Sequence, residues 1–372
     1  MRHECPAPTS TSPRRRPTPA RNDNTEGAAV RLGVAVAYWP WFRLKEQIDI
    51  ARLADELGFD SVWVAETWGQ EAVSVLGHLT AVTERIRLGA AVLQIPARQP
   101  TAVAAAAATL NDLSAGRFML GLGLSGPQVS EGWYGVPFTR PLARTREYLE
   151  VVRAALSGKP VDHQGEQWAI PAYGQGLGQG LPFKLLAPPA DRRVPLYLGV
   201  SGARTVEQAG ALADGWLPFL FSPDHAQELT APLLRGIEKA GRDRSDVDVA
   251  PIVPMALADD VATARDQIRP FITFYLGGMG SQEKNFYVDL ADRYGHGASA
   301  RACQERFLAG DRRGAAAELS DDLIDLVSLP ATDGTLPEGL ARYEEAGADT
   351  VIAMPFGNRA RLLRALAAHR RA

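Results

Sequence analysis

Cysteine and histidine are scarce and scattered in this 372-residue sequence. Cys5 and Cys303 are the only cysteines, too few for a disulfide framework or a cysteine-based zinc site. None of the six histidines directly follows an expected strand, so a metal centre or a histidine-activated nucleophile has little support. We therefore expect no metal, and the cysteine usage is typical of a cytoplasmic protein.

A strong net charge and long apolar runs are also lacking. Forty Lys and Arg residues against 43 Asp and Glu give a formal charge of -3, which provides no basic field for nucleic acid or an anionic membrane. The longest apolar stretches, such as residues 102–108, are rich in alanine and far shorter than the roughly 20 residues of a membrane span. We expect neither nucleic acid nor membrane as a partner.

The first 29 residues have little hydrophobic content. They are rich in Pro, Thr, Ser and Arg, and no apolar segment follows Arg14–Arg16, so a secretory signal is not expected. Such composition predicts a disordered N-terminal extension over residues 1–29, followed by one domain over residues 30–372.

From Arg31 onward, short runs rich in β-branched residues alternate with longer helical patterns. This alternation predicts an α/β fold with a parallel sheet. Helices are expected at 43–57, 70–83 and 100–113. Eight strands favour a closed (β/α)₈ TIM barrel over an open sheet, and they are expected at 32–37, 61–65, 86–93, 117–124, 195–200, 215–219, 247–257 and 350–354.

A weak repeat marks the helix-to-strand junctions. Residues 56–62 and 345–351 share the pattern Glu-x-Gly-x-Asp-Ser/Thr-Val, and residues 212–216 are a looser copy. Either true repetition or convergent turn chemistry explains the pattern, and both require αβ units.

Two insertions interrupt the barrel pattern, near residues 158–194 and 277–330. Within the first, residues 161–170 predict a short hairpin and residues 173–181 a glycine-rich loop; the second is polar and helical. Long excursions on a barrel usually cover the active-site face or build an oligomer contact. We expect a homodimer.

The residues that directly follow the expected strands are aromatic, small and nearly uncharged, with Glu66 as one carboxylate among them. In TIM barrels the chemistry collects at this end of the strands. An aromatic lining suits a planar cofactor that performs the chemistry itself and a small-molecule substrate, whereas hydrolysis is disfavoured. Aromatic residues fill cores as well as clefts, so packing is the alternative for the candidate substrate-binding residues, which are Trp39, Trp41, Trp68, Trp133 and Tyr134.

The segment Gly199–Ala203 lies between an expected strand and an expected helix. Exposed backbone N–H groups and the helix dipole at such a turn hold phosphate. Gly202 is alternatively a turn residue that needs a positive φ.

Several stretches together resemble the coenzyme F420-dependent branch of the bacterial luciferase-like flavin enzymes. They are residues 54–66, 86–93, 125–135 and 277–287, and above all 110–123 with its Leu-Ser-x-Gly-Arg-Phe-x-Leu-Gly-Leu-Gly run. The resemblance extends from Arg31 to about Ala367. It implies a luciferase-like barrel that transfers a hydride between carbon 5 of the deazaflavin F420 and a small organic substrate with a C=C, C=N or C–OH group.

The resemblance also implies site residues. It places a non-proline cis peptide at Ala91–Val92, behind the cofactor ring, and the cofactor phosphate on Gly199, Val200, Ser201 and Gly202. Ring contacts are expected from Glu66, Thr67, Leu124 and Ser125. Glu66 is our candidate catalytic residue, and it either only positions the cofactor or also donates or accepts a proton; the resemblance does not carry over a proton donor, because several relatives have other residues at Glu66–Thr67 and Leu124–Ser125. Two alternatives remain open, a monooxygenase that uses reduced FMN and a flavin- or deazaflavin-binding protein without catalysis.

Overall fold

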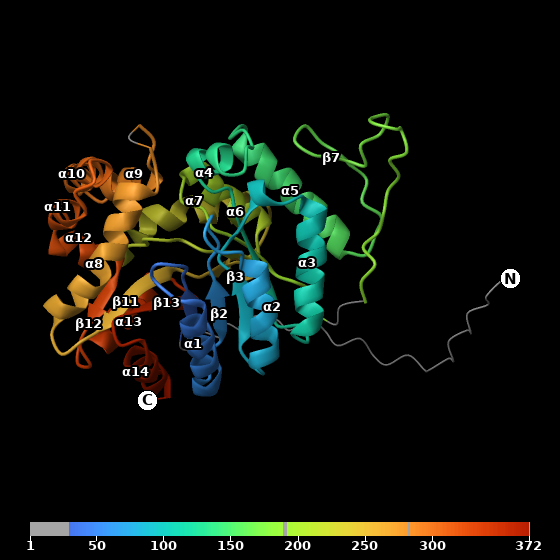
Figure 1. The fold of residues 1–372 in the computed structure, drawn as a ribbon. Helices are drawn as coiled ribbons and strands as arrows, with labels where there is room; N and C mark the ends of the chain where they lie inside the picture. The colour runs from blue at the N-terminus through green and yellow to red at the C-terminus, as the bar shows by residue number, and fades with distance from the viewer. Residues whose placement is uncertain (1–29, 189–191, 282, 372) are drawn as a thin grey trace.

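The computed structural model of the protein describes residues 30–188, 192–281 and 283–371; the extension expected over residues 1–29 lies outside them. Parallel strands curl around a common axis, with helices on the outside (Figure 1). The strands of this sheet are β1 (Arg31–Val36), β2 (Ser61–Val64), β3 (Arg87–Ala90), β4 (Leu93–Gln94), β5 (Phe118–Gly123), β8 (Leu196–Leu198), β9 (Gly215–Trp216), β10 (Asp248–Val249), β11 (Ile252–Leu257), β12 (Leu329–Ala331) and β13 (Thr350–Phe356).

The sheet closes on itself at a break in one strand. Its order runs from β10 through β9, β8, β5, β3, β2, β1 and β13 to β11. Only Ala250 and Pro251 separate β10 from β11, and the amide of Ile252 donates to the carbonyl of Pro218 beyond β9. The expected TIM barrel is therefore confirmed. The continuous strand expected over 247–257 was wrong, because Pro251 has no amide hydrogen for the ladder.

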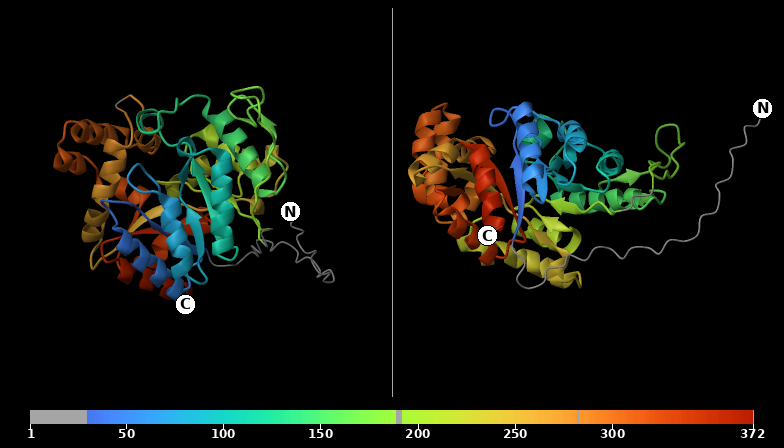
Figure 2. Two further views of the ribbon diagram at one scale, coloured as in Figure 1. Left: turned by 45° about the vertical axis from the view of Figure 1, so that its right-hand side comes forward. Right: turned by 90° about the horizontal axis from the view of Figure 1, so that it is seen from below.

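Helices cover the outside of the barrel in alternation with the strands (Figure 2). The first three confirm the expected helices, and α1 ends at Gly58, whose φ of +82° suits glycine. None of the described helices is long and apolar enough to cross a membrane. The helices around the barrel are α1 (Leu44–Leu57), α2 (Ala72–Val82), α3 (Pro100–Leu113), α5 (Pro141–Leu156), α6 (Ala203–Leu212), α7 (Ala226–Lys239), α8 (Val261–Gly278), α13 (Leu336–Glu345) and α14 (Arg359–Arg371).

The repeated junction motif has one physical role at its three sites. The carboxylate of Asp60 accepts a hydrogen bond of 3.0 Å from the amide of Leu32. Asp214 accepts one of 2.8 Å from the amide of Leu196 in the same way. Asp349 accepts one of 2.8 Å from Val249. Each aspartate thus binds a backbone amide at the start of a neighbouring strand and fixes the register of the pair.

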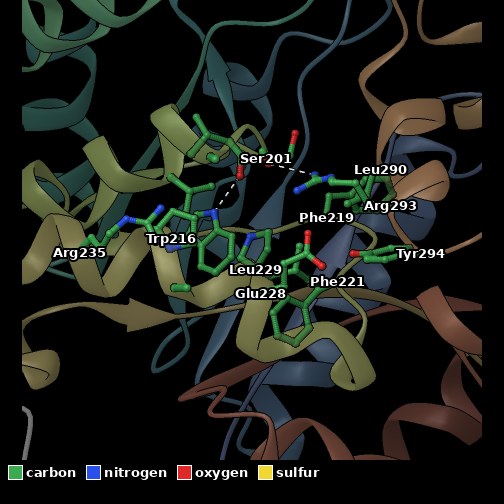
Figure 3. A pocket seen from close by; sticks show the side chains of 16 residues that line it. Ser201, Trp216, Phe219, Phe221, Glu228, Leu229, Arg235, Leu290, Arg293 and Tyr294 are labelled. Atoms are coloured by element: carbon green, nitrogen blue, oxygen red, sulfur yellow. Dashed lines mark hydrogen bonds between the residues drawn. The ribbon is translucent and has the colours of Figure 1, made fainter.

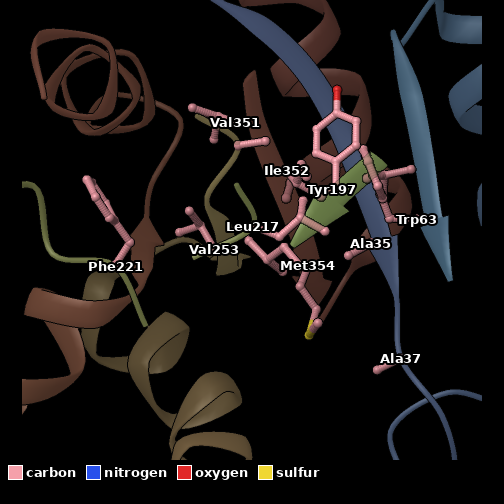
Figure 4. Packing of buried hydrophobic residues seen from close by; sticks show 14 of the residues in the cluster. Ala35, Ala37, Trp63, Tyr197, Leu217, Phe221, Val253, Val351, Ile352 and Met354 are labelled. Atoms are coloured by element: carbon pink, nitrogen blue, oxygen red, sulfur yellow. The ribbon is translucent and has the colours of Figure 1, made fainter. Parts of the chain in front are cut away.

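Buried apolar side chains from several strands, among them Trp63, Tyr197 and Met354, form part of the hydrophobic core (Figure 4). Trp63 and Tyr197 meet edge to face, with ring centroids 5.0 Å apart. Gly89 and Gly215 provide the room, since a Cβ on either would lie within 2.2 Å of these rings.

Both expected insertions are present. The first contains the predicted hairpin, formed by β6 (His163–Gln164) and β7 (Ala169–Ile170), and continues through turns at residues 173–178 and an irregular segment to Pro188. The second is helical, as expected. Its helices are α9 (Phe286–Arg293), α10 (Gly297–Leu308), α11 (Arg312–Ala317) and α12 (Asp321–Val327), and the short helix α4 (Pro127–Gly132) follows β5.

Candidate active site

A cavity of about 720 Å³ opens at the carboxyl ends of the barrel strands. Its lining is mainly apolar and aromatic, and Glu66 and Lys284 are its only charged members among the described residues. The ten residues expected to contact the cofactor all line it: Glu66, Thr67, Ala91, Val92, Leu124, Ser125, Gly199, Val200, Ser201 and Gly202.

The peptide bond between Ala91 and Val92 is cis, as the sequence resemblance implied. It lies between β3 and β4 and forms one wall of the cavity. The backbone around it leaves little space. A Cβ on Gly123 or on Gly199 would lie 2.6 or 2.8 Å from a methyl carbon of Val92. The two glycines therefore set the position of the Val92 side chain.

The turn before α6 forms another part of the wall. Gly202 is the N-cap of this helix, whose first turn carries no acidic residue. Its φ of -76° is ordinary, and a Cβ there would make only one contact near 3.4 Å, with Thr205. The alternative that Gly202 needs a positive φ was therefore wrong. The free amides at this helix start suit an anion.

A second, smaller cavity of about 310 Å³ lies beside this turn and shares Val200, Ser201 and Phe219 with the first (Figure 3). The guanidinium of Arg293 on α9 donates a hydrogen bond of 3.5 Å to the carbonyl of Ser201. The turn therefore has a cation on its outer side in addition to the helix dipole.

Glu66 is buried and fully hydrogen-bonded. Arg98 donates to both carboxylate oxygens at 2.7 Å. The amide of Ala72 donates to Oε1 and the amide of Gln94 to Oε2. Burial lowers the pKa of Arg98, but hydrogen bonds and charge from Glu66 and Glu71 outweigh it and raise this pKa overall. These four hydrogen bonds fix the position of the carboxylate.

The structure brings only part of the aromatic set to the cavity. Trp68 and Trp133 line it. Trp39 is exposed, with its ring near Arg43, and Tyr134 is not part of the lining. Trp41 packs edge-on against Phe271, with ring centroids 5.1 Å apart. It is therefore a packing residue, the alternative given above for the aromatic candidates.

Three tyrosines in the lining were not among the candidate site residues predicted from the sequence, although Tyr38 directly follows the first expected strand. The hydroxyl groups of Tyr38 and Tyr275 are 2.9 Å apart, close enough for one to donate to the other. Tyr275 on α8 packs edge-on against Tyr287, with centroids 5.1 Å apart, and against Phe219 at 4.6 Å. Tyr38 follows β1, and residues directly after a strand are the ones that the sequence analysis considers for the site. Tyr275 and Tyr287 belong to the helices α8 and α9, which the sequence analysis does not consider for the site.

Burial raises the pKa of both phenols in this pair. For Tyr38 the hydrogen bond to Tyr275 partly opposes the effect, and for Tyr275 the charge and hydrogen bond of Tyr38 add to it. Both hydroxyls therefore stay protonated at neutral pH and can donate a hydrogen bond.

The comparisons with known proteins agree with this geometry. The chain is 37% identical over 329 residues, 87% of its length, to a protein of Mycobacterium tuberculosis whose name assigns it provisionally to the coenzyme F420-dependent oxidoreductases; 95% of that protein is covered. It is 28% identical over 313 residues to the 5,10-methylenetetrahydromethanopterin reductase of Archaeoglobus fulgidus, covering 82% of this chain and 88% of the reductase.

Solved structures share the fold. The coenzyme F420-dependent tetrahydromethanopterin reductase of Methanopyrus kandleri superposes with a TM-score of 0.76 at 21% identity, over 91% of this chain and 98% of that one. An F420-dependent secondary alcohol dehydrogenase, solved with an F420–acetone adduct, superposes with a TM-score of 0.71 at 21% identity. The superposition covers 88% of this chain and 93% of the dehydrogenase. The luciferase-like monooxygenase family model matches residues 17–350, and the chain belongs to this family.

Proposed function

We propose that the protein is a coenzyme F420-dependent oxidoreductase that transfers a hydride between the deazaflavin and a small organic substrate with a C=C, C=N or C–OH group. The observation that carries this proposal is that one cavity joins the wall at Ala91 and Val92 to the helix start at Gly202. A planar ring with a phosphate-bearing side chain matches these two features.

The described residues fit such a cofactor. The wall at Ala91 and Val92 would support the ring, and the amides at Ser201 and Gly202 would bind the phosphate, with no acidic side chain in the first turn of α6 to repel it. When bound, F420 supplies a two-electron hydride acceptor or donor at its carbon 5. The barrel contributes orientation and a largely apolar environment.

Glu66 acts in this proposal as a positioning residue. Its two oxygens already accept four hydrogen bonds from Arg98, Ala72 and Gln94. It ties the residues after β2 to the residues after β4 and thereby fixes one side of the cavity. A proton-transfer role would require breaking this set, so we assign it none.

Tyr38 is the proton donor in our proposal. A substrate that gains a hydride at carbon also takes up a proton, at oxygen, nitrogen or the neighbouring carbon. Tyr38 lines the cavity and holds its proton at neutral pH, and Tyr275 positions its hydroxyl from a ring fixed by aromatic packing. Trp68 and Trp133 would contact the substrate.

We also infer a cytoplasmic homodimer. The buried free thiol of Cys303 is consistent with a reducing compartment. Exposed apolar side chains on the first insertion are consistent with self-association.

The cofactor is tested by titrating the purified protein with F420 and with FMN, followed by fluorescence. We expect F420 to bind at micromolar concentration or tighter and FMN at least tenfold more weakly. Equal affinity, or FMN that purifies with the protein and consumes oxygen when reduced, would favour the monooxygenase. Tight F420 binding without turnover of enones, imines or alcohols would favour a non-catalytic binding protein.

A further inference from the structure

The first insertion carries an arm, defined here as residues 173–188, that stands away from the barrel beyond α5 and β7 (Figure 1, Figure 2). Its base is well fixed. Glu147 on α5 accepts hydrogen bonds from the amides of Glu166, Gln167 and Trp168, and the ring of Trp168 packs edge-on against Tyr148. The arm therefore leaves the barrel in a defined direction.

Beyond its base the arm makes few bonds to its own chain. Within the insertion, the carbonyl of Phe183 accepts a hydrogen bond from the amide of Val161, and no backbone hydrogen bond joins residues 176–188 to described residues outside the insertion. Lys184 is the only charged residue in the arm. Such a segment has neither the charge of a solvated loop nor the contacts of a packed one.

Four large apolar side chains of the arm face solvent. Leu177 and Leu186 are each 91% exposed, Phe183 is 79% exposed and Leu181 67%. Monomeric proteins rarely expose such clusters, and larger apolar patches mark interaction sites.

We infer that the arm binds a second copy of this chain, so that two protomers exchange arms across a two-fold axis. This inference rests on the homodimer proposed above. In a two-fold interface each arm contacts the surface that its own protomer offers to the other arm. The receiving surface must therefore be present on this same molecule.

The outer faces of α2 and α3 are such a surface. Asp112 is the only Asp, Glu, Lys or Arg in these two helices, and α3 turns Ala102, Ala105 and Ala106 away from the core. α3 packs beside α5, the helix that anchors the arm. An uncharged face of small side chains lets an extended apolar segment approach closely, without desolvating charges.

The size of the contact suits a stable dimer. The four apolar side chains offer on the order of 100 Å² each. Two arms and the surfaces that they cover would together bury on the order of 1,600 Å², the size of a standard protein interface. Folding of the arm onto its own barrel is the alternative, and it predicts no change in oligomeric state when the arm is altered.

The experiment is sedimentation velocity on the full chain over about 0.1–20 μM, with melting curves of each variant. The test variant is Leu177→Ser/Leu181→Ser/Phe183→Ser/Leu186→Ser. Its matched control is Leu234→Ser/Leu308→Ser, which removes exposed leucines from α7 and α10. Ala105→Glu probes the receiving face.

We expect a dimeric wild type and control, and a dimer dissociation constant raised at least 100-fold in the arm variant and in Ala105→Glu, with melting of the monomer unchanged. If the arm variant does not fold, the single change Phe183→Ser replaces it. A monomeric wild type would overturn the homodimer and the arm exchange together. A dimer that is indifferent to the arm variants would overturn the arm exchange alone.

Discussion

The hydroxyl of Tyr148 on α5 donates a hydrogen bond of 3.1 Å to the backbone carbonyl of Arg98, the residue whose guanidinium holds Glu66. The cavity wall is thus braced from the helix layer outside the barrel. A chain of contacts runs from Tyr148 through Arg98 to Glu66, and it fixes the position of the carboxylate.

Glu66→Gln is expected to lower the free energy of unfolding by about 2–3 kcal/mol, because it leaves Arg98 with a weaker partner in a buried position. Cofactor affinity should fall as the wall loosens, while the pH profile of turnover keeps both limbs. Chemical denaturation, fluorescence titration and steady-state kinetics measure these effects. Loss of one limb of the profile would return Glu66 to a proton-transfer role.

Gly202→Asp is expected to weaken F420 binding by 10- to 100-fold, about 1.4–2.8 kcal/mol, because it places a carboxylate at the helix start that we propose as the phosphate site. Gly202→Ala is the matched control. With φ at -76° and room for a Cβ, the alanine variant should fold and bind as the wild type does. Calorimetric titration measures the F420 affinity of both variants. An unchanged affinity of Gly202→Asp would contradict the proposed phosphate site at this turn.

Tyr38→Phe is expected to slow reduction of an enone or ketone by 10²- to 10⁴-fold, the usual contribution of a positioned proton donor, with F420 affinity within threefold of wild type. Because burial raises the pKa of Tyr38, wild-type turnover should show no alkaline limb from this phenol below about pH 10.

Tyr287→Phe serves as the matched control, since it removes a phenol from the same lining without touching the bond between Tyr38 and Tyr275. Single-turnover kinetics and cofactor titration separate the two effects. Equal rates for both variants would show that the proton comes from elsewhere.

Much of this site could be predicted from the sequence because strand ends follow from periodicity. Residues after β2, β3, β5 and β8 were found by their position alone or through the resemblance, and all ten line the cavity. Trp41 follows β1 but leaves the cavity, because its amide and that of Phe42 donate to the carbonyl of Tyr38 and turn the chain back.

The tyrosines on α8 and α9 could not be found by the same rule. Tyr275 lies in the last turns of a helix that follows β11, and Tyr287 lies in the insertion. Helical periodicity shows which side of a helix is apolar, but the direction in which an inserted helix folds over the barrel is set by tertiary packing.

Asp55 offers a test of stability against pH. Its carboxylate accepts hydrogen bonds from the amides of Glu84, Arg85 and Ile86, which lower its pKa although burial acts to raise it. A lowered folded-state pKa gives stability that is present above the unfolded value, about 3.9, and lost as the pH falls through the folded value.

Asp55→Asn should therefore lower the free energy of unfolding by about 2 kcal/mol at pH 7, and the gap to wild type should narrow below about pH 4. Urea unfolding at several pH values measures this difference in the free energy of unfolding. A gap that stays constant down to pH 3 would mean that the charge of Asp55 does not contribute.

The crowding around Val92 bears on how such an enzyme can be redesigned. Gly123 at the end of β5 and Gly199 just after β8 approach its methyl groups, so a methyl group added at either position would displace this wall of the cavity. Variant libraries that change Val92, Gly123 or Gly199 in this wall should yield mostly inactive proteins. Libraries that vary Trp68, Trp133 and Lys284, which line the cavity from loops, should retain cofactor binding while exploring new substrates.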